Sequence, residues 1–557
     1  MRLVGSRGAL ALLLALAATG PLRADEPSYR VLNPRGYQPE TTLVPLAARP
    51  GDLNGKVVYV VHAWPANVPS GFETVVTGVE AGLKTKFPDI RLVDRYKDSA
   101  YSEDEPELWA EVKQKAAAFI YVPADSAATT MWSVTWSGKL EGMGVPGVTL
   151  HFAALAENAE RTRAKVGTPV RLVSVAGSSA PAADITDQIA KALTTPPGSA
   201  ETRAGPVREA PPPRIALEGS LAHVQTYFDE HHRTDGLPIV PPTEEAVAAM
   251  LKGTRHGKDE IVTRAMVPEG WPVTVEKVAI NGVMAGAPPS AMPVLLAAVE
   301  AFGSGHFASS VRSTNSFSFM QLVNGPIISE IGMNAGTYAL GPGNHANATI
   351  GRALRLFIYN LGGGENGVNL MGTQGNVGSY AFCFAENEAA SPWEPFQVTR
   401  GFRREDSTIT IFAGGWSHTG NMLHQDLKRL ARDVAYFQWP SGLVALLSPA
   451  TANELAKSGM SKADVERELW QNATLTMGEF RNDHYYQRFI IPILKGKEMN
   501  GVKNRWPASY LNLPDDARVP VYPKNDVHVV VVGGEANAMM QGWNMYGATT
   551  APIDKWR

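Results

Sequence analysis

Between residues 51 and 194, short continuous apolar runs alternate with segments whose apolar residues recur at helical spacing. The runs predict buried strands at residues 56–61, 90–93, 118–122, 146–150 and 170–175. The periodic segments predict helices at 72–83, 108–115, 131–143, 155–165 and 185–193. Buried strands that alternate with helices are typical of a doubly wound parallel sheet, in which ligands bind at loops after the carboxyl ends of strands.

The second half, residues 214–557, predicts a larger mixed α/β domain with more irregular loops and no strong repeat. Strands are expected at 273–280, 317–323, 380–384, 407–412, 443–447 and 527–532, and helical segments at 293–299, 424–437 and 450–470. Residues 195–213 are rich in proline and lack apolar periodicity, so they predict a linker between the domains. Residues 25–50 predict an extended lead-in.

One strongly periodic helix stands out in this second domain. Its apolar face is Ile350, Leu354, Phe357, Ile358 and Leu361, whereas Arg352, Arg355 and Tyr359 lie on another face. Gly341-Pro342-Gly343 predicts a turn before it, and Asn344 or Asn347 can cap its first amides. Such a helix start attracts an oxyanion. The competing interpretation is an ordinary capped helix that enters a core.

Polar residues near predicted strand ends and this helix start suggest one pocket for a small anion. Arg352 would hold the anion, and Glu386 or Glu388 would move a proton, because burial of one carboxyl can separate their pKa values. The other residues expected to bind substrate are Asn324, Asn344, His345, Asn347 and Trp393. For each residue alone, a solvated loop is the better explanation, and the pocket is suggested by their co-occurrence. No spacing indicates a metal, and the cofactor is left open.

The amino terminus resembles a secretory signal. Basic residues precede an apolar run too short to span a bilayer, and Leu22-Arg23-Ala24 suggests cleavage after Ala24. We therefore expect a soluble periplasmic or secreted protein without a membrane span. The net charge of -3 gives no reason to expect nucleic acid as a partner. The single cysteine, Cys383, excludes an internal disulfide and is expected to be a buried small hydrophobe.

Residues 43–193 resemble a family of small α/β proteins named for a U-G-S-C motif, in which U is selenocysteine or cysteine. The likeness rests on Thr130-Met131-Trp132-Ser133-Val134 and on Leu140-Glu141-Gly142-Met143-Gly144-Val145-Pro146. Placing the family's loop at residues 124–130 puts Ser126 and Thr129 at the two redox positions. Thiol–disulfide exchange needs a thiolate or selenolate, so these residues argue against it. Helix capping is the preferred role for both.

In the second domain, Asn324-Gly325-Pro326, residues 341–352 and residues 386–396 resemble uncharacterised partner polypeptides of U-G-S-C proteins. That resemblance implies no reaction. Two functional hypotheses follow from the sequence. The first is an exported two-domain enzyme, of lyase or hydrolase type, that acts on a small anionic organic molecule. The second is a periplasmic solute-binding or sensor protein without catalysis. The substrate and the oligomeric state stay open.

Overall fold

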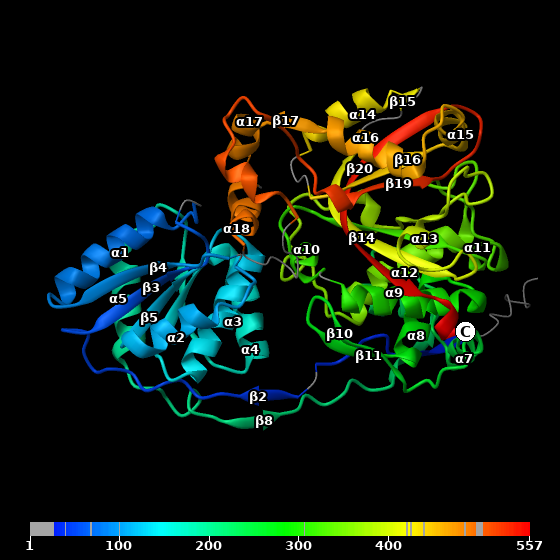
Figure 1. The fold of residues 1–557 in the computed structure, drawn as a ribbon. Helices are drawn as coiled ribbons and strands as arrows, with labels where there is room; N and C mark the ends of the chain where they lie inside the picture. Colours follow the sequence, from blue (N-terminus) through cyan, green and yellow to red (C-terminus); the bar gives the residue numbers. More distant parts are fainter. Residues whose placement is uncertain are drawn as a thin grey trace, which may run out of the picture.

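A computed structural model of the chain describes residues 27–38, 40–66, 69–99, 101–305, 307–418, 422–423, 426–437, 441–483, 486–496 and 505–557. The predicted signal peptide, residues 1–24, lies outside these ranges. Within the ranges, none of the helices combines the length and the hydropathy that a membrane crossing requires. Figure 1 shows two α/β bodies side by side, the first in blue and cyan and the second in green to red.

The first body is a doubly wound parallel sheet, as the apolar runs predict. Its strands lie in the order β4-β3-β5-β6-β7, and every neighbouring pair is parallel. Helices α1 and α5 cover one apolar core, and α2 and α3 cover another. The elements are β3 (Val57–His62), α1 (Glu73–Lys86), β4 (Arg91–Tyr96), α2 (Pro106–Lys115), β5 (Ala118–Val122), α3 (Ala127–Gly142), β6 (Gly147–Phe152), α4 (Ala156–Val166), β7 (Arg171–Val175) and α5 (Ala182–Thr194).

The lead-in and the linker run between the two bodies as paired strands. β1 (Ser28–Leu32) pairs antiparallel with β9 (Ile215–Ser220), and β2 (Thr41–Leu43) pairs with β8 (Gly205–Val207). Val31 and Leu32 are buried in the core of the second body. The chain thus crosses between the bodies twice, along the lower edge of Figure 1. Part of the lead-in completes the second domain.

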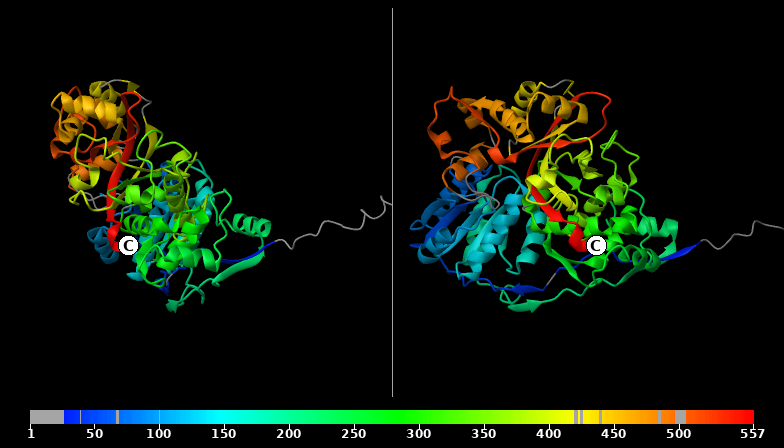
Figure 2. Two further views of the ribbon diagram at one scale, coloured as in Figure 1. Left: turned by 90° about the vertical axis from the view of Figure 1, so that its right-hand side faces the viewer. Right: turned by 45° about the vertical axis from the view of Figure 1, so that its right-hand side comes forward.

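The second body is built on a mixed sheet in the order β13-β12-β14-β20-β16-β19, with β15 paired to β20. Helices α9 and α12 pack against one face of it, and α8 packs against these two helices. The strands are β12 (Ser318–Asn324), β13 (Cys383–Ala385), β14 (Thr408–His418), β15 (Met422–Leu423), β16 (Leu443–Leu447), β19 (Val527–Val531) and β20 (Met539–Pro552). Figure 2 shows the long β20, in red, crossing this body.

This sheet contains the same topology twice, although the sequence shows no repeat. β12 pairs parallel with β13 and antiparallel with β14. β16 pairs in the same way with β19 and β20. The antiparallel pair β14–β20 joins the two units. The free edges also meet, because the Asn387 amide donates to the Val531 carbonyl oxygen at 2.8 Å.

The remaining elements flank this sheet. The helices are α6 (Leu221–Glu230), α7 (Glu244–Leu251), α8 (Val275–Ala285), α9 (Met292–Ser304), α10 (Ala308–Val311), α11 (Ile327–Glu330), α12 (His345–Asn360), α13 (Phe396–Thr399), α14 (Leu427–Ala435), α15 (Pro449–Lys457), α16 (Lys462–Asn472), α17 (Met477–Asn482) and α18 (Ile491–Leu494). Two antiparallel strand pairs are β10 (Ile261–Met266) with β11 (Trp271–Thr274), and β17 (Thr474–Thr476) with β18 (Arg518–Pro520).

One predicted element of this body is wrong. The strand expected at 273–280 ends at Thr274, whose side chain accepts a hydrogen bond from Lys277 N and so caps α8. The helical region expected at 450–470 is confirmed, and it consists of two helices, since Gly459 adopts a φ of +91° that ends the first. β20 was not predicted, because its glycines and polar residues hide the apolar alternation of a strand.

Candidate functional site

The start of α12 is a self-contained loop. The predicted apolar face is confirmed, since all five of its residues are buried. The predicted capping is wrong: the Asn344 side chain makes no cap hydrogen bond and donates instead to the carbonyls of Tyr338 and Gly341. Asn347 is likewise occupied within the loop, where it accepts from Asn334 N and donates to the Asn334 carbonyl. His345 is exposed. These amides hold the loop rather than a ligand.

Arg352, expected to hold the anion, is already neutralised by the protein. Its Nε and one terminal nitrogen each lie 2.8 Å from the Asp235 carboxylate, a bidentate pair. The same nitrogen donates to the carbonyls of Leu237 and Pro238. Only 3% of the Asp235 side chain is exposed. Asp235 comes from the loop between α6 and α7, which is remote in sequence, so the pattern around α12 could not reveal this pair.

Three of the predicted residues do come together. Asn324 Nδ2 donates to Glu386 at 2.6 Å and to Glu388 at 3.0 Å. Glu388 also accepts from Gly325 N, and Lys462 Nζ lies 3.4 Å from Glu386. The indole of Trp393 makes its hydrogen bond outside this cluster, since it donates to the Met460 carbonyl. No hydrogen bond or ion pair among the described residues joins Arg352 to either carboxylate, so the expected single constellation is divided in two.

The two carboxyl groups of this cluster differ in environment. Burial raises the pKa of Glu388 above its usual value, although the hydrogen bond from Gly325 N opposes the change. Glu386 is almost fully buried, and it accepts from Phe396 N as well as from Asn324. The protein's own donors thus surround both carboxyl groups.

The raised pKa of Glu388 predicts a dependence of stability on pH. Below the unfolded-state pKa, the carboxyl is protonated in both states and contributes nothing. As pH rises through the raised folded-state pKa, ionisation in a desolvated site favours the unfolded chain, so stability is lost. Glu388→Gln should therefore raise the unfolding temperature at pH 7 relative to the wild type, with a smaller difference at pH 4. The control is Glu394→Gln, an exposed carboxyl paired with Arg404. An equal difference at both pH values would contradict the prediction.

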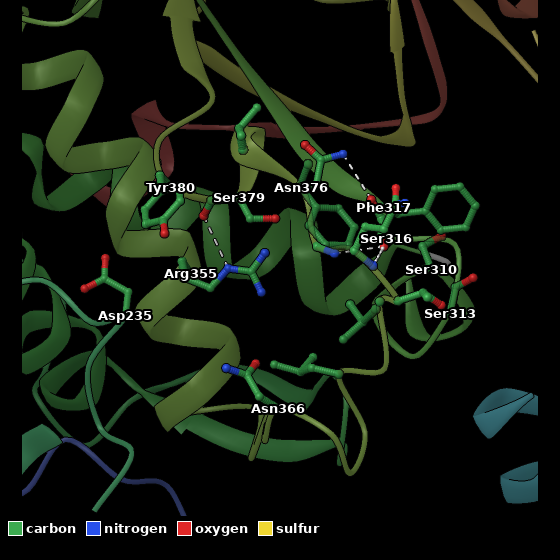
Figure 3. Close-up of a pocket in the computed structure, with 18 of the residues that line it drawn as sticks. Asp235, Ser310, Ser313, Ser316, Phe317, Arg355, Asn366, Asn376, Ser379 and Tyr380 are labelled. Atoms are coloured by element: carbon green, nitrogen blue, oxygen red, sulfur yellow. Dashed lines mark hydrogen bonds between the residues drawn. The ribbon is translucent and has the colours of Figure 1, made fainter. Parts of the chain in front are cut away.

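A cavity of about 670 Å³ lies beside α12, and Figure 3 shows its wall. It is bounded by α10, β12, α12 and the glycine-rich loop at residues 366–376. Arg355 of α12 projects into it. Burial lowers the pKa of the Arg355 guanidinium. Its Nε donates to the Ser379 carbonyl at 3.3 Å, and the group lies 5.7 Å from the Tyr359 ring centre.

Arg355 differs from Arg352 in having no ion-pair partner among the described residues. Asp235 also borders the cavity, but its carboxylate is bound by Arg352. A desolvated cation without a counter-ion is costly, and a ligand carboxylate or phosphate would supply one. The sequence placed Arg355 on the polar face of this helix, yet nothing in the pattern distinguished it from Arg352.

The first domain supports one wall of this cavity. Asn158 of α4 donates to the Val368 carbonyl at 3.0 Å, and Arg161 of α4 forms an ion pair with Glu365. Ser316 Oγ accepts from the amides of Gln374 and Gly375, which holds the other end of the loop. The cavity wall is thus anchored by both domains.

The first domain has a smaller cavity of about 490 Å³ at the carboxyl ends of β3 and β4. There His62 Nε2 lies 2.8 Å from Asp94 Oδ1, and the imidazole stacks on Tyr96 with ring centres 4.2 Å apart. Burial lowers the pKa of His62 although Asp94 opposes the change. This edge of the sheet is where doubly wound domains place ligands.

Ser126 and Thr129 act as a helix cap. Ser126 Oγ accepts from Thr129 N at 3.2 Å, and Thr129 Oγ1 accepts from Ser126 N, which forms a capping box at the start of α3. Cys383 is buried, and burial raises the pKa of its thiol. No group of three or more His, Cys, Asp or Glu side chains in the described ranges could hold a metal ion.

The five parallel strands in this order define the first domain as a doubly wound α/β domain of the class with strand order 2-1-3-4-5. A model of the UGSC family matches residues 30–195, which span that domain, so this part of the chain is a UGSC-family domain. The likeness seen at residues 43–193 is thereby confirmed. No curated protein matches the chain, and no solved structure matches it either.

Proposed function

We propose that this protein is exported and binds a small organic anion in the Arg355 cavity. The observation that carries the proposal is a desolvated guanidinium that faces a cavity without a carboxylate partner among the described residues. Removing an arginine from water is unfavourable unless its charge is compensated. A planar guanidinium fork matches a carboxylate in a bidentate pair, and such pairs are strong in a desolvated site.

Within this proposal, the protein is an enzyme of lyase or hydrolase type. Thiol redox chemistry has no support, because the redox positions of the UGSC domain are a serine and a threonine in a helix cap and the only cysteine is buried. A cavity bounded by Asp235, Tyr359 and Tyr380 next to an arginine supplies both an anion anchor and hydroxyl groups that can orient a substrate.

The alternative is solute binding without turnover, and one observation favours it. The two chain segments that connect the domains form antiparallel strand pairs with each other, β1 with β9 and β2 with β8, so the connection is not one isolated spacer. In addition, both domains anchor a wall of the cavity. Receptors that close around a solute use a hinge between two α/β domains. Both functions require the same anion site.

The test uses the chain from Asp25 onward, screened by thermal unfolding against small carboxylic acids and inorganic phosphate. A ligand at 100 times its Kd should stabilise the fold by about 2.7 kcal/mol. Any acid that stabilises the protein is then incubated with it and analysed by NMR. Consumption supports the enzyme, and recovery unchanged supports the solute-binding protein. If no acid stabilises the wild type, or if Arg355→Met is stabilised equally, the anion site is wrong.

A further inference from the structure

The Arg355 cavity has an apolar mouth. Val377 is 87% exposed and Tyr380 is 56% exposed, and both line the cavity. Single exposed apolar residues are common on protein surfaces. These two, however, flank one short turn, residues 377–379, and Phe317 and Val311 continue the apolar surface toward the interior.

The apolar mouth is held at a set position relative to the arginine. Asn376 Oδ1 accepts from Gly378 N, and Asn376 Nδ2 donates to the Ser316 carbonyl, so the turn is tied to the start of β12. The Ser379 carbonyl at the end of the same turn accepts from Arg355 Nε. Figure 3 shows Arg355 beside this turn, with Tyr380 on one side and Phe317 on the other. A charged end and an apolar end therefore belong to one preformed site.

The size and the charge of the cavity restrict what fits. Its volume, about 670 Å³, lies within the range of about 300–1,000 Å³ that encloses drug-sized ligands, so a bare anion would leave most of it empty. Among the described residues that line the cavity, Arg355 is the cation without an ion-pair partner, and it matches a single negative charge. Asp235 also borders the cavity, and its carboxylate disfavours a second charge on the ligand.

We propose that the ligand is an amphipathic monocarboxylic acid, whose carboxylate pairs with Arg355 and whose aliphatic or aromatic body covers Val377 and Tyr380. This inference rests on the proposed anion site and adds the chemical class of its occupant. Burial of the two exposed side chains supplies the affinity that distinguishes such an acid from phosphate or from a hydroxylated acid. The guanidinium supplies the orientation.

The experiment is a calorimetric titration of the chain from Asp25 onward at constant ionic strength. The probes are butanoate, hexanoate, octanoate, 3-phenylpropanoate, gluconate and inorganic phosphate. Each added methylene should tighten the Kd about fourfold, because burying one is worth about 0.8 kcal/mol and tenfold in affinity is about 1.4 kcal/mol. Gluconate and phosphate should bind at least tenfold more weakly than octanoate.

The double variant Val377→Ser, Tyr380→Ser should flatten this dependence on chain length, so that the Kd of octanoate rises much more than the Kd of butanoate. The matched control is Tyr436→Ser, because Tyr436 is 66% exposed and does not line the cavity. Octanoate binding no tighter than butanoate, or gluconate binding as tightly as octanoate, would overturn the amphipathic ligand but leave the anion site standing. Failure of all six probes to bind would overturn the anion site itself.

Discussion

Replacement of Arg355 by methionine should weaken binding of the organic anion by about 100-fold or more. Truncating one partner of a buried charge pair costs about 3–5 kcal/mol, and about 1.4 kcal/mol corresponds to a factor of ten. Methionine keeps the apolar stem of the side chain that packs along α12, so the fold should tolerate the change. Calorimetric titration of the wild type and the variant with the acid identified by the screen measures the effect.

The same variant should not lose stability when the ligand is absent. Arg355 has no ion-pair partner in the described part of the chain, and burying its charge on folding costs free energy of desolvation. Its removal should therefore leave the unfolding temperature unchanged or higher. Arg355→Lys is the matched control: it keeps the charge but loses the planar fork, and it should retain part of the affinity. A destabilised Arg355→Met that binds the acid normally would show that the arginine is structural.

Replacement of Arg352 by methionine, unlike that of Arg355, should destabilise the fold. The expected loss in the free energy of unfolding is about 3–5 kcal/mol. Asp235 is 3% exposed, and without Arg352 its carboxylate would be buried without its bidentate partner. Denaturant unfolding of the wild type and the variant measures this loss.

The double variant Arg352→Met, Asp235→Asn provides the control for that prediction. Removing the buried charge together with its partner should recover much of the stability, so the two substitutions should be strongly non-additive. If Arg352→Met were as stable as the wild type, or if the double variant were no more stable than Arg352→Met, the ion pair would not hold the loop at Asp235. Together, the variants of Arg352 and Arg355 separate a structural arginine from a ligand-binding one on the same helix.

The first domain could be predicted nearly completely because its signals are local. Buried parallel strands are continuous apolar runs, and the helices between them carry their own periodicity, so both can be seen without knowledge of the neighbours. The strands and the sheet topology of the second domain were harder to predict from the sequence. β20 pairs with strands on both sides, yet its glycines and polar residues mask it, and the repeated topology of the sheet has no counterpart in the sequence pattern.

None of the predicted site residues lines the Arg355 cavity, although three of them form a separate cluster. Asn324, Glu386 and Glu388 follow two strands that pair in parallel, so their carboxyl ends meet at one edge and the side chains come together. The helical spacing places both Arg352 and Arg355 on the polar face of α12, but it does not show which of them faces a ligand. The residue that separates them is Asp235, which comes from another loop and forms its ion pair with Arg352.

The sequence alone thus determined the strand–helix alternation of the UGSC domain and the polar face of α12, since each depends on residue type or on spacing within one segment. Only the tertiary structure decided which arginine forms the ion pair with Asp235 and which arginine faces the cavity. Those properties depend on which remote segments pack together, and the residue pattern of a single segment does not reveal such contacts.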